Sequence, residues 1–163
     1  MTYDPWSLSK SNSEDAHQVA IFAWANVAMS FGVTAASDIL SYSVPGHAKK
    51  YISAAFDKPV PEFRWLHAIP NGGSRGDTER SRKIRGAQLK AQGVKAGVSD
   101  MCLPVKRNGF SGLYIELKKP GKIKDTSSEQ DEFGEFVISQ GYMFEVCDSW
   151  EKAVHLLKLY IVS

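Results

Sequence analysis

Residues 112–120 read GLYIELKKP, and this stretch decides how the rest of the chain is interpreted. Alternation places Leu113, Ile115 and Leu117 on one face of a strand, and the carboxylate of Glu116 beside the ammonium of Lys118 on the other. One face is therefore suited to a hydrophobic core. The polar face leaves two interpretations, a surface ion pair or half of an active site, and the surrounding sequence must decide between them.

The composition of the chain is that of an ordinary globular protein. Its 163 residues are 43% hydrophobic and 23% charged, which disfavours global disorder and predicts one domain spanning 1–163. No stretch reaches the roughly 18 uninterrupted apolar residues of a membrane span, and no secretory signal is visible. We therefore expect a cytoplasmic protein without membrane contact, in which Cys102 and Cys147 stay reduced.

Hydrophobic periodicity and turn signals predict a mixed α/β domain with the order αβαββαβα. The expected helices cover 14–30, 77–92 and 128–140, and a last helix begins near 148. The expected strands cover 63–69, 98–105, 112–120 and 142–147. The turn 107–109 joins the second and third strands into an antiparallel hairpin. We expect residues 1–12 to be flexible, 13–30 to form the first core helix, 31–62 to be a variable insertion with a short helix near 47–56, and 63–162 to form the catalytic core.

Basic residues gather in one part of the chain. Seven of them against two acids fall between Arg75 and Lys95: Arg75, Arg80, Arg82, Lys83, Arg85, Lys90 and Lys95. A localised basic patch is typical of a phosphate-binding surface, although a solvated helix face has the same pattern.

The segment GVSD at 97–100 supplies a partner for Glu116. If the hairpin forms, Asp100 and Glu116 come from adjacent strands, and two neighbouring carboxylates need a cation to ionise together. Oxygen ligands without a His or Cys cluster suit Mg²⁺ or Mn²⁺. Lys118 would add a positive charge beside a reacting water or phosphoryl oxygen, so this set predicts metal-assisted phosphodiester hydrolysis. A turn role for Asp100 stays open.

The pattern GVSD followed by YIELKKP resembles the catalytic signature of the PD-(D/E)xK nuclease superfamily, with Ser99 in place of the usual proline. The fuller sequence is similar to one branch, the VRR-NUC (virus-type replication-repair nuclease) domain. The segments that carry this resemblance are HAIPNGG (67–73), the basic helix, GVSD (97–100), GLYIELK (112–118), SSEQ (127–130), GYMFEV (141–146) and SWEKA (149–153). The resemblance implies a restriction-endonuclease-like core with a mixed four-stranded sheet flanked by helices.

The resemblance also implies roles for individual residues. Asp100, Glu116 and the backbone carbonyl of Leu117 would bind the metal, Lys118 would be the catalytic lysine, and Gln130 would lie near the metal or substrate. The first helix would contribute another acid, for which Glu14 is the candidate, with Asp15 adjacent. The DNA contacts would come from Asn71, Arg75, Arg80, Arg82, Lys83, Arg85 and Lys119. For Gln130 a second interpretation exists, because Ser127 and Gln130 have the spacing of a helix capping box.

The function that follows is a Mg²⁺- or Mn²⁺-dependent, structure-selective DNA endonuclease. Its expected substrates are branched DNA such as Holliday junctions or flaps, in viral or mobile-element replication and repair, within the host cytoplasm if the chain is viral. We expect a homodimer, and the first helix, apolar almost all round, could supply its interface. The alternatives are a non-catalytic DNA-binding module on the same fold and a structural protein without a nucleic-acid role.

Overall fold

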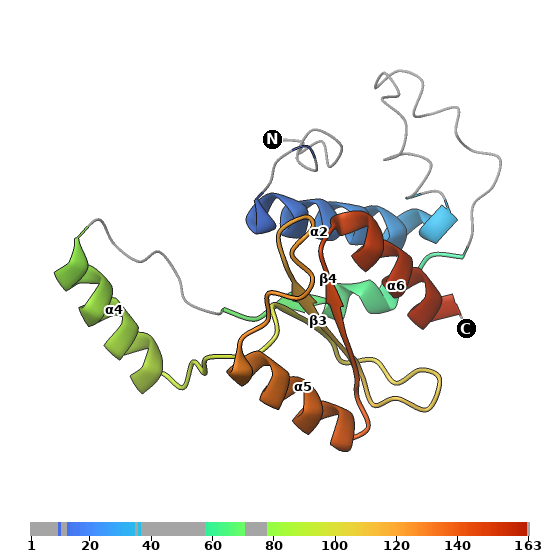
Figure 1. The fold of residues 1–163 in the computed structure, drawn as a ribbon. Coiled ribbons are helices and arrows are strands. Elements are labelled where there is room, and N and C mark those ends of the chain that lie inside the picture. The colour runs from blue at the N-terminus through green and yellow to red at the C-terminus, as the bar shows by residue number, and fades with distance from the viewer. Residues whose placement is uncertain (1–9, 11–12, 35, 37–57, 71–77, 163) are drawn as a thin grey trace.

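The computed structural model describes residues 10, 13–34, 36, 58–70 and 78–162, which Figure 1 shows as a ribbon. The helices are α2 (Glu14–Phe31), α4 (Glu79–Ala91), α5 (Ser128–Ser139) and α6 (Trp150–Val162), with a 3-10 helix, η2 (Pro61–Trp65). The strands are β1 (His67–Ala68), β2 (Met101–Leu103), β3 (Leu113–Leu117) and β4 (Met143–Cys147). This order confirms the predicted mixed α/β fold. The helix expected near 47–56, and nearly all of 1–12, lie outside the described residues.

The four strands form one sheet in the order β1-β2-β3-β4. The pairs β1–β2 and β2–β3 are antiparallel, whereas β3 and β4 are parallel and are connected through α5. The β2–β3 hairpin confirms the expected turn, in which Asn108 and Gly109 both have positive φ angles, 53° and 85°. Its register places Met101 opposite Ile115.

Helices cover both faces of the sheet. In Figure 1, α2 and α6 lie against one face and α5 lies against the other. The face toward α2 and α6 carries the hydrophobic core, in which Ile115 of β3 belongs to the same buried cluster as Trp24 and Leu157. On the other face, Tyr114 packs edge-on against Phe133 of α5, with ring centroids 5.2 Å apart. The polar side of β3 therefore faces α5.

All four strands are shorter in the structure than predicted, and the first differs most. The expected strand over 63–69 was wrong for most of its length, because Pro61 opens a 3-10 helix and only His67 and Ala68 pair with β2. Phe63 of that helix is buried and packs against Trp24 at 5.4 Å between ring centroids. The second strand ends at 103 rather than 105, where Pro104 lacks the N–H that a strand ladder needs.

The helix surfaces also differ in part from the predictions. The spacing of Asp148 and Glu151 predicts a capping box with Asp148 as the N-cap of α6, but the N-cap is Ser149, whose Oγ accepts from the N–H of Lys152. In α2, burial is confined to one broad side, and Val19 on the other side is 38% exposed. No residue of α4 is buried. None of the described helices is long and apolar enough to span a membrane.

Candidate active site

The β2–β3 register brings Asp100 beside Glu116. Since Met101 lies opposite Ile115, the next position along the antiparallel pair sets Asp100 opposite Glu116. Two backbone contacts hold Asp100 there. Its carbonyl accepts from the N–H of Ile69 at 2.7 Å, and its Oδ2 accepts from the N–H of Leu117 at 2.8 Å. The structure therefore joins the two carboxylates that the sequence predicts as a pair.

Glu116 is an acid held in an unfavourable environment. It is only 2% exposed, and its Oε2 is buried with no hydrogen-bond partner among the described residues. Burial, followed by the negative charge of Asp100, raises the pKa of Glu116 to about 7. The hydrogen bond and charge of Lys118 oppose this rise, and the charge of Glu14 adds to it. Lys118 therefore compensates the negative charge of ionised Glu116 only in part.

Lys118 supplies the one nearby cation among the described contacts of Glu116. It is 9% exposed, and its Nζ lies 3.0 Å from Oε1 of Glu116. The backbone N–H of Lys118 donates to the carbonyl of Cys147 at 2.7 Å, so the sheet pairing continues one residue past β3. The Lys118 side chain is therefore held over the carboxylate rather than left mobile in solvent.

Gln130 makes both the helix-capping contacts and the active-site contacts that the sequence offered as alternatives. Within the capping box at the start of α5, its N–H donates to Oγ of Ser127, and its side-chain Oε1 accepts from the N–H of Ser127. The same Oε1 accepts from Nζ of Lys118 at 2.7 Å, and Nε2 donates to Oε1 of Glu116. The alternatives of helix cap and site residue are thus compatible, because a single side chain makes both sets of contacts.

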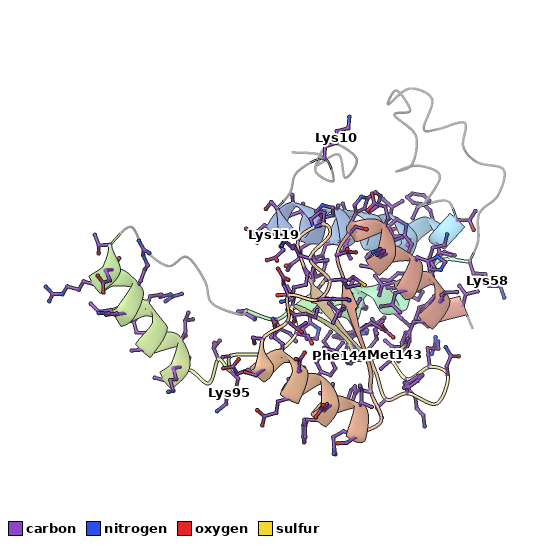
Figure 2. The ribbon with its side chains drawn as sticks, in the orientation of Figure 1. Lys10, Lys58, Lys95, Lys119, Met143 and Phe144 are labelled. Carbon is purple, nitrogen blue, oxygen red and sulfur yellow. The ribbon has the colours of Figure 1, made fainter. Side chains whose placement is uncertain are left out.

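Glu14 lies at the edge of this group. It is the first residue of α2, and its Oε1 accepts from the backbone N–H of Lys119 at 3.1 Å. Figure 2 shows Lys119 at the N-terminal end of α2. Glu14 is thus tied to the residue that follows Lys118, while Asp15 does not figure among the charges that shift the pKa of Glu116.

The residues expected to contact DNA fall into three groups. Asn71 and Arg75 lie outside the described residues. Arg80, Arg82, Lys83 and Arg85 are exposed on α4, which stands apart from the sheet in Figure 1. Lys119 is exposed beside α2. The basic helix and the carboxylates are therefore not brought into one cluster by the described fold.

The donor set suits a hard divalent cation with few protein ligands. Among the described residues, no group of three or more His, Cys, Asp or Glu side chains is arranged to hold a metal ion. Two carboxylates and a backbone carbonyl match Mg²⁺, which commonly keeps several of its waters when bound to protein. The buried Oε2 of Glu116, without a partner in the described residues, is the atom that such an ion would satisfy.

Two residues near the site make contacts that were not predicted from the sequence. Gly97 has a φ of +81°, and a Cβ atom there would lie 2.4 Å from the carbonyl oxygen of Glu129, so the loop before Asp100 packs directly on the first turn of α5. Asp148 accepts from the N–H of Gly121 at 3.2 Å and so holds the loop after Lys118. Gly97 belongs to the GVSD motif, but its contact with α5 depends on tertiary packing.

Comparison with known proteins identifies the family and the fold of the chain. The model of the VRR-NUC domain matches residues 69–151, just over half of the chain. A solved structure titled "VRR_NUC domain protein" has a TM-score of 0.59 and 22% sequence identity, and the match covers 91% of this chain and 88% of that one. This likeness shows the same fold. A comparison with curated proteins finds no match. The chain belongs to the VRR-NUC domain family, as its sequence motifs predicted.

Proposed function

We propose that this chain is a Mg²⁺- or Mn²⁺-dependent DNA endonuclease that hydrolyses phosphodiester bonds in branched DNA, such as Holliday junctions or flaps, during viral or mobile-element replication and repair. The observation that carries the proposal is Glu116. Its carboxylate is buried, faces Asp100, contacts Lys118 through one oxygen and has no hydrogen-bond partner among the described residues at the other. A purely structural ion pair between Glu116 and Lys118 gives no reason to place a second carboxylate, that of Asp100, beside the buried one.

The metal would be held by Asp100, Glu116 and the carbonyl of Leu117. A divalent cation at such a site lowers the pKa of bound water and polarises a phosphate oxygen. A divalent cation fits this site because the two carboxylates repel each other. Burial and Asp100 disfavour the ionised form of Glu116, and the cation would favour it. Glu14, whose charge also acts on Glu116, is the candidate for an additional acid at the site.

The chain's own residues would then orient and stabilise the reacting phosphate. The ammonium of Lys118 is available to stabilise negative charge on a phosphoryl oxygen, and a fixed positive group is worth most in a partly water-excluded site. Gln130 holds that ammonium at 2.7 Å and contacts Glu116 as well. Because the side chains of Lys118 and Glu116 are already held in place before the substrate binds, little reorganisation is needed during the reaction.

DNA would be bound mainly through its phosphates. The exposed basic residues of α4, with Lys119 near the carboxylates, offer positive charge on two sides of a bound strand. Asn71 and Arg75, outside the described residues, belong to the same proposed surface. These residues position the duplex and carry no sequence preference, which suits an enzyme that selects DNA by its structure.

The proposal includes a homodimer. One site cuts one strand, so paired cuts across a junction need two sites related by symmetry. The outer side of α2 supports this, because Val19, Phe22 and Ala23 line a groove of about 590 Å³ together with Ala68 of β1, beside the polar residues Asp15, Gln18 and Asn26. A second copy of the chain would cover these apolar groups. Sedimentation showing a monomer at micromolar concentration would remove this part of the proposal.

The proposal is tested with labelled four-way junction, flap and duplex DNA in Mg²⁺, Mn²⁺ or EDTA. We expect cuts in the branched substrates with either metal and none in EDTA. If only the duplex were cut, the chain would be a nuclease without selectivity for branched DNA. Tight, salt-sensitive binding without cutting would instead favour the alternative, a DNA-binding module that uses the basic α4 alone.

A further inference from the structure

The carboxamide of Gln130 can satisfy its neighbours in one orientation only. The N–H of Ser127 and the ammonium of Lys118 can only donate, and both reach Oε1, at 3.0 and 2.7 Å. The carboxylate of Glu116 accepts from Nε2. If the amide were reversed, its NH₂ group would face two donors and its oxygen would face a carboxylate. The direction of the amide is therefore set by the backbone of the capping box as well as by the site.

Ser127 holds Gln130 at both ends. Its Oγ accepts from the backbone N–H of Gln130 at 3.3 Å, and its own N–H donates to the side-chain Oε1. The first bond fixes the helical turn from which the side chain projects, and the second fixes the amide oxygen that Lys118 uses. The same turn is fixed against the segment leading to Asp100, because Gly97 packs on the backbone of Glu129.

We propose that Ser127 is a positioning residue for the active site: through Gln130 it sets where the ammonium of Lys118 stands relative to the carboxylate of Glu116. This inference rests on the proposed nuclease function and extends it to a residue that does not itself touch the reacting groups. In most helices an N-cap serine stabilises only the helix. In α5 the residue it caps is also the one that contacts both Lys118 and Glu116.

The chain contains a matched control for this idea. Ser149 is the N-cap of α6, and its Oγ accepts from the N–H of Lys152, also at 3.3 Å. The side chain of Lys152 pairs with Asp148, not with Glu116 or Lys118. Ser127→Ala and Ser149→Ala therefore remove the same atom and a capping bond of the same length from two helices. The two variants differ in the contacts of the capped residue, because Gln130 contacts Lys118 and Glu116 whereas Lys152 contacts Asp148.

The test compares single-turnover cleavage of branched DNA by Ser127→Ala, Ser127→Thr and Ser149→Ala. We expect both alanine variants to lower Tm by about 2–4 °C, the usual effect of losing one cap in a chain of this size. Only Ser127→Ala should lower the cleavage rate at saturating DNA, by about tenfold, as is common for groups that orient site ligands, without changing the DNA concentration at half-maximal rate. Ser127→Thr, which keeps the hydroxyl, should restore the rate.

A second measurement reads the position of Gln130 directly. The side-chain amide signals of Gln130 in a ¹H–¹⁵N spectrum are identified by their loss in Gln130→Glu. We expect them to shift toward solvent-exposed values in Ser127→Ala and to stay in place in Ser149→Ala. This readout needs no DNA, so it decides the inference even if the protein cuts nothing. Unchanged Gln130 signals in Ser127→Ala, or an equal loss of rate in Ser149→Ala, would overturn the inference.

Discussion

The backbone N–H of Leu117 donates a hydrogen bond to Oδ2 of Asp100 across 2.8 Å. This bond fixes the carboxylate of Asp100, the residue just before β2, at the end of β3. The negative charge of Asp100 therefore acts on Glu116. Two carboxylates are thus held together by the backbone rather than by an intervening cation of the protein. The arrangement predicts measurable effects on stability as well as on catalysis.

The metal-free protein is expected to lose stability between pH 5 and pH 8 because of Glu116. The pKa of this group is about 7 in the folded chain against an ordinary value of 4.5. Between these values the folded chain holds a proton that the unfolded chain has lost, so the free energy of unfolding falls as pH rises. The full effect above pH 7 is roughly 3 kcal/mol. Urea unfolding in EDTA at pH 5 and pH 8 measures it, and Glu116→Gln should abolish this part of the dependence. Equal pH dependence in the two proteins would show that Glu116 does not titrate as described.

Asp100→Asn should lower the pKa of Glu116 and make the metal-free protein more stable at pH 8. An amide oxygen can still accept from the N–H of Leu117, but the negative charge beside Glu116 is removed. Mg²⁺, which should raise the Tm of the native protein more at pH 8 than at pH 5, should no longer do so in this variant. Asp15→Asn is the control, since it removes an exposed acid one residue from Glu14. If Mg²⁺ stabilises Asp100→Asn as well as the native protein, Asp100 is not a ligand.

Gly97→Ala should destabilise the chain far more than the same change at Gly109. Both glycines have positive φ, +81° and +85°, so both variants carry similar backbone strain. A Cβ at Gly109 meets nothing within 4 Å, whereas at Gly97 it would lie 2.4 Å from the carbonyl oxygen of Glu129. We expect losses of about 1–2 kcal/mol at Gly109 and about 2–4 kcal/mol at Gly97 in urea unfolding. Equal losses would mean that the loop before Asp100 does not press on α5.

The pairing of Asp100 with Glu116 could be predicted because its causes are local. Alternation along 113–117 sets the face of Glu116, and the turn at Asn108 and Gly109 makes the two strands an antiparallel hairpin. The exact opposing residue does not follow from the turn, because the bridge between Arg107 and Phe110 differs by one residue in register from the pair Met101 and Ile115. The start of α5 was likewise predictable from the spacing of Ser127 and Gln130.

Other features depend on contacts that no local pattern encodes. Residues 63–69 have the composition of a strand, but Pro61 and the packing of Phe63 on Trp24 favour a 3-10 helix over 61–65. The capping box and the site contacts of Gln130 were separate interpretations in the sequence, and only the approach of α5 to β3 shows that one side chain serves both. The orientation of the amide follows from three neighbours, two of them distant in sequence.

Removing two charges from α4 should weaken DNA binding without changing stability. Arg82 and Arg85 are exposed, and α4 buries no residue, so Arg82→Gln with Arg85→Gln should leave Tm unchanged. If both contact phosphates, the slope of log K against log salt should fall by about 2. Lys58→Gln with Lys106→Gln removes the same net charge elsewhere, with Lys58 on the side of the molecule away from α4 (Figure 2). Equal slopes for the two double variants would show that α4 does not bind DNA.

The most direct test of the account is the cleavage rate of a labelled four-way junction in Mg²⁺ by the native protein, Lys118→Ala and Lys124→Ala. Lys118 contacts Glu116 and Gln130, whereas Lys124 is an exposed lysine six residues further along. We predict a loss of about 10²–10³-fold in Lys118→Ala, the size expected for one group that stabilises transition-state charge, and the native rate in Lys124→Ala. Cleavage by Lys118→Ala at the native rate would contradict the assignment of this site as the active site of a nuclease.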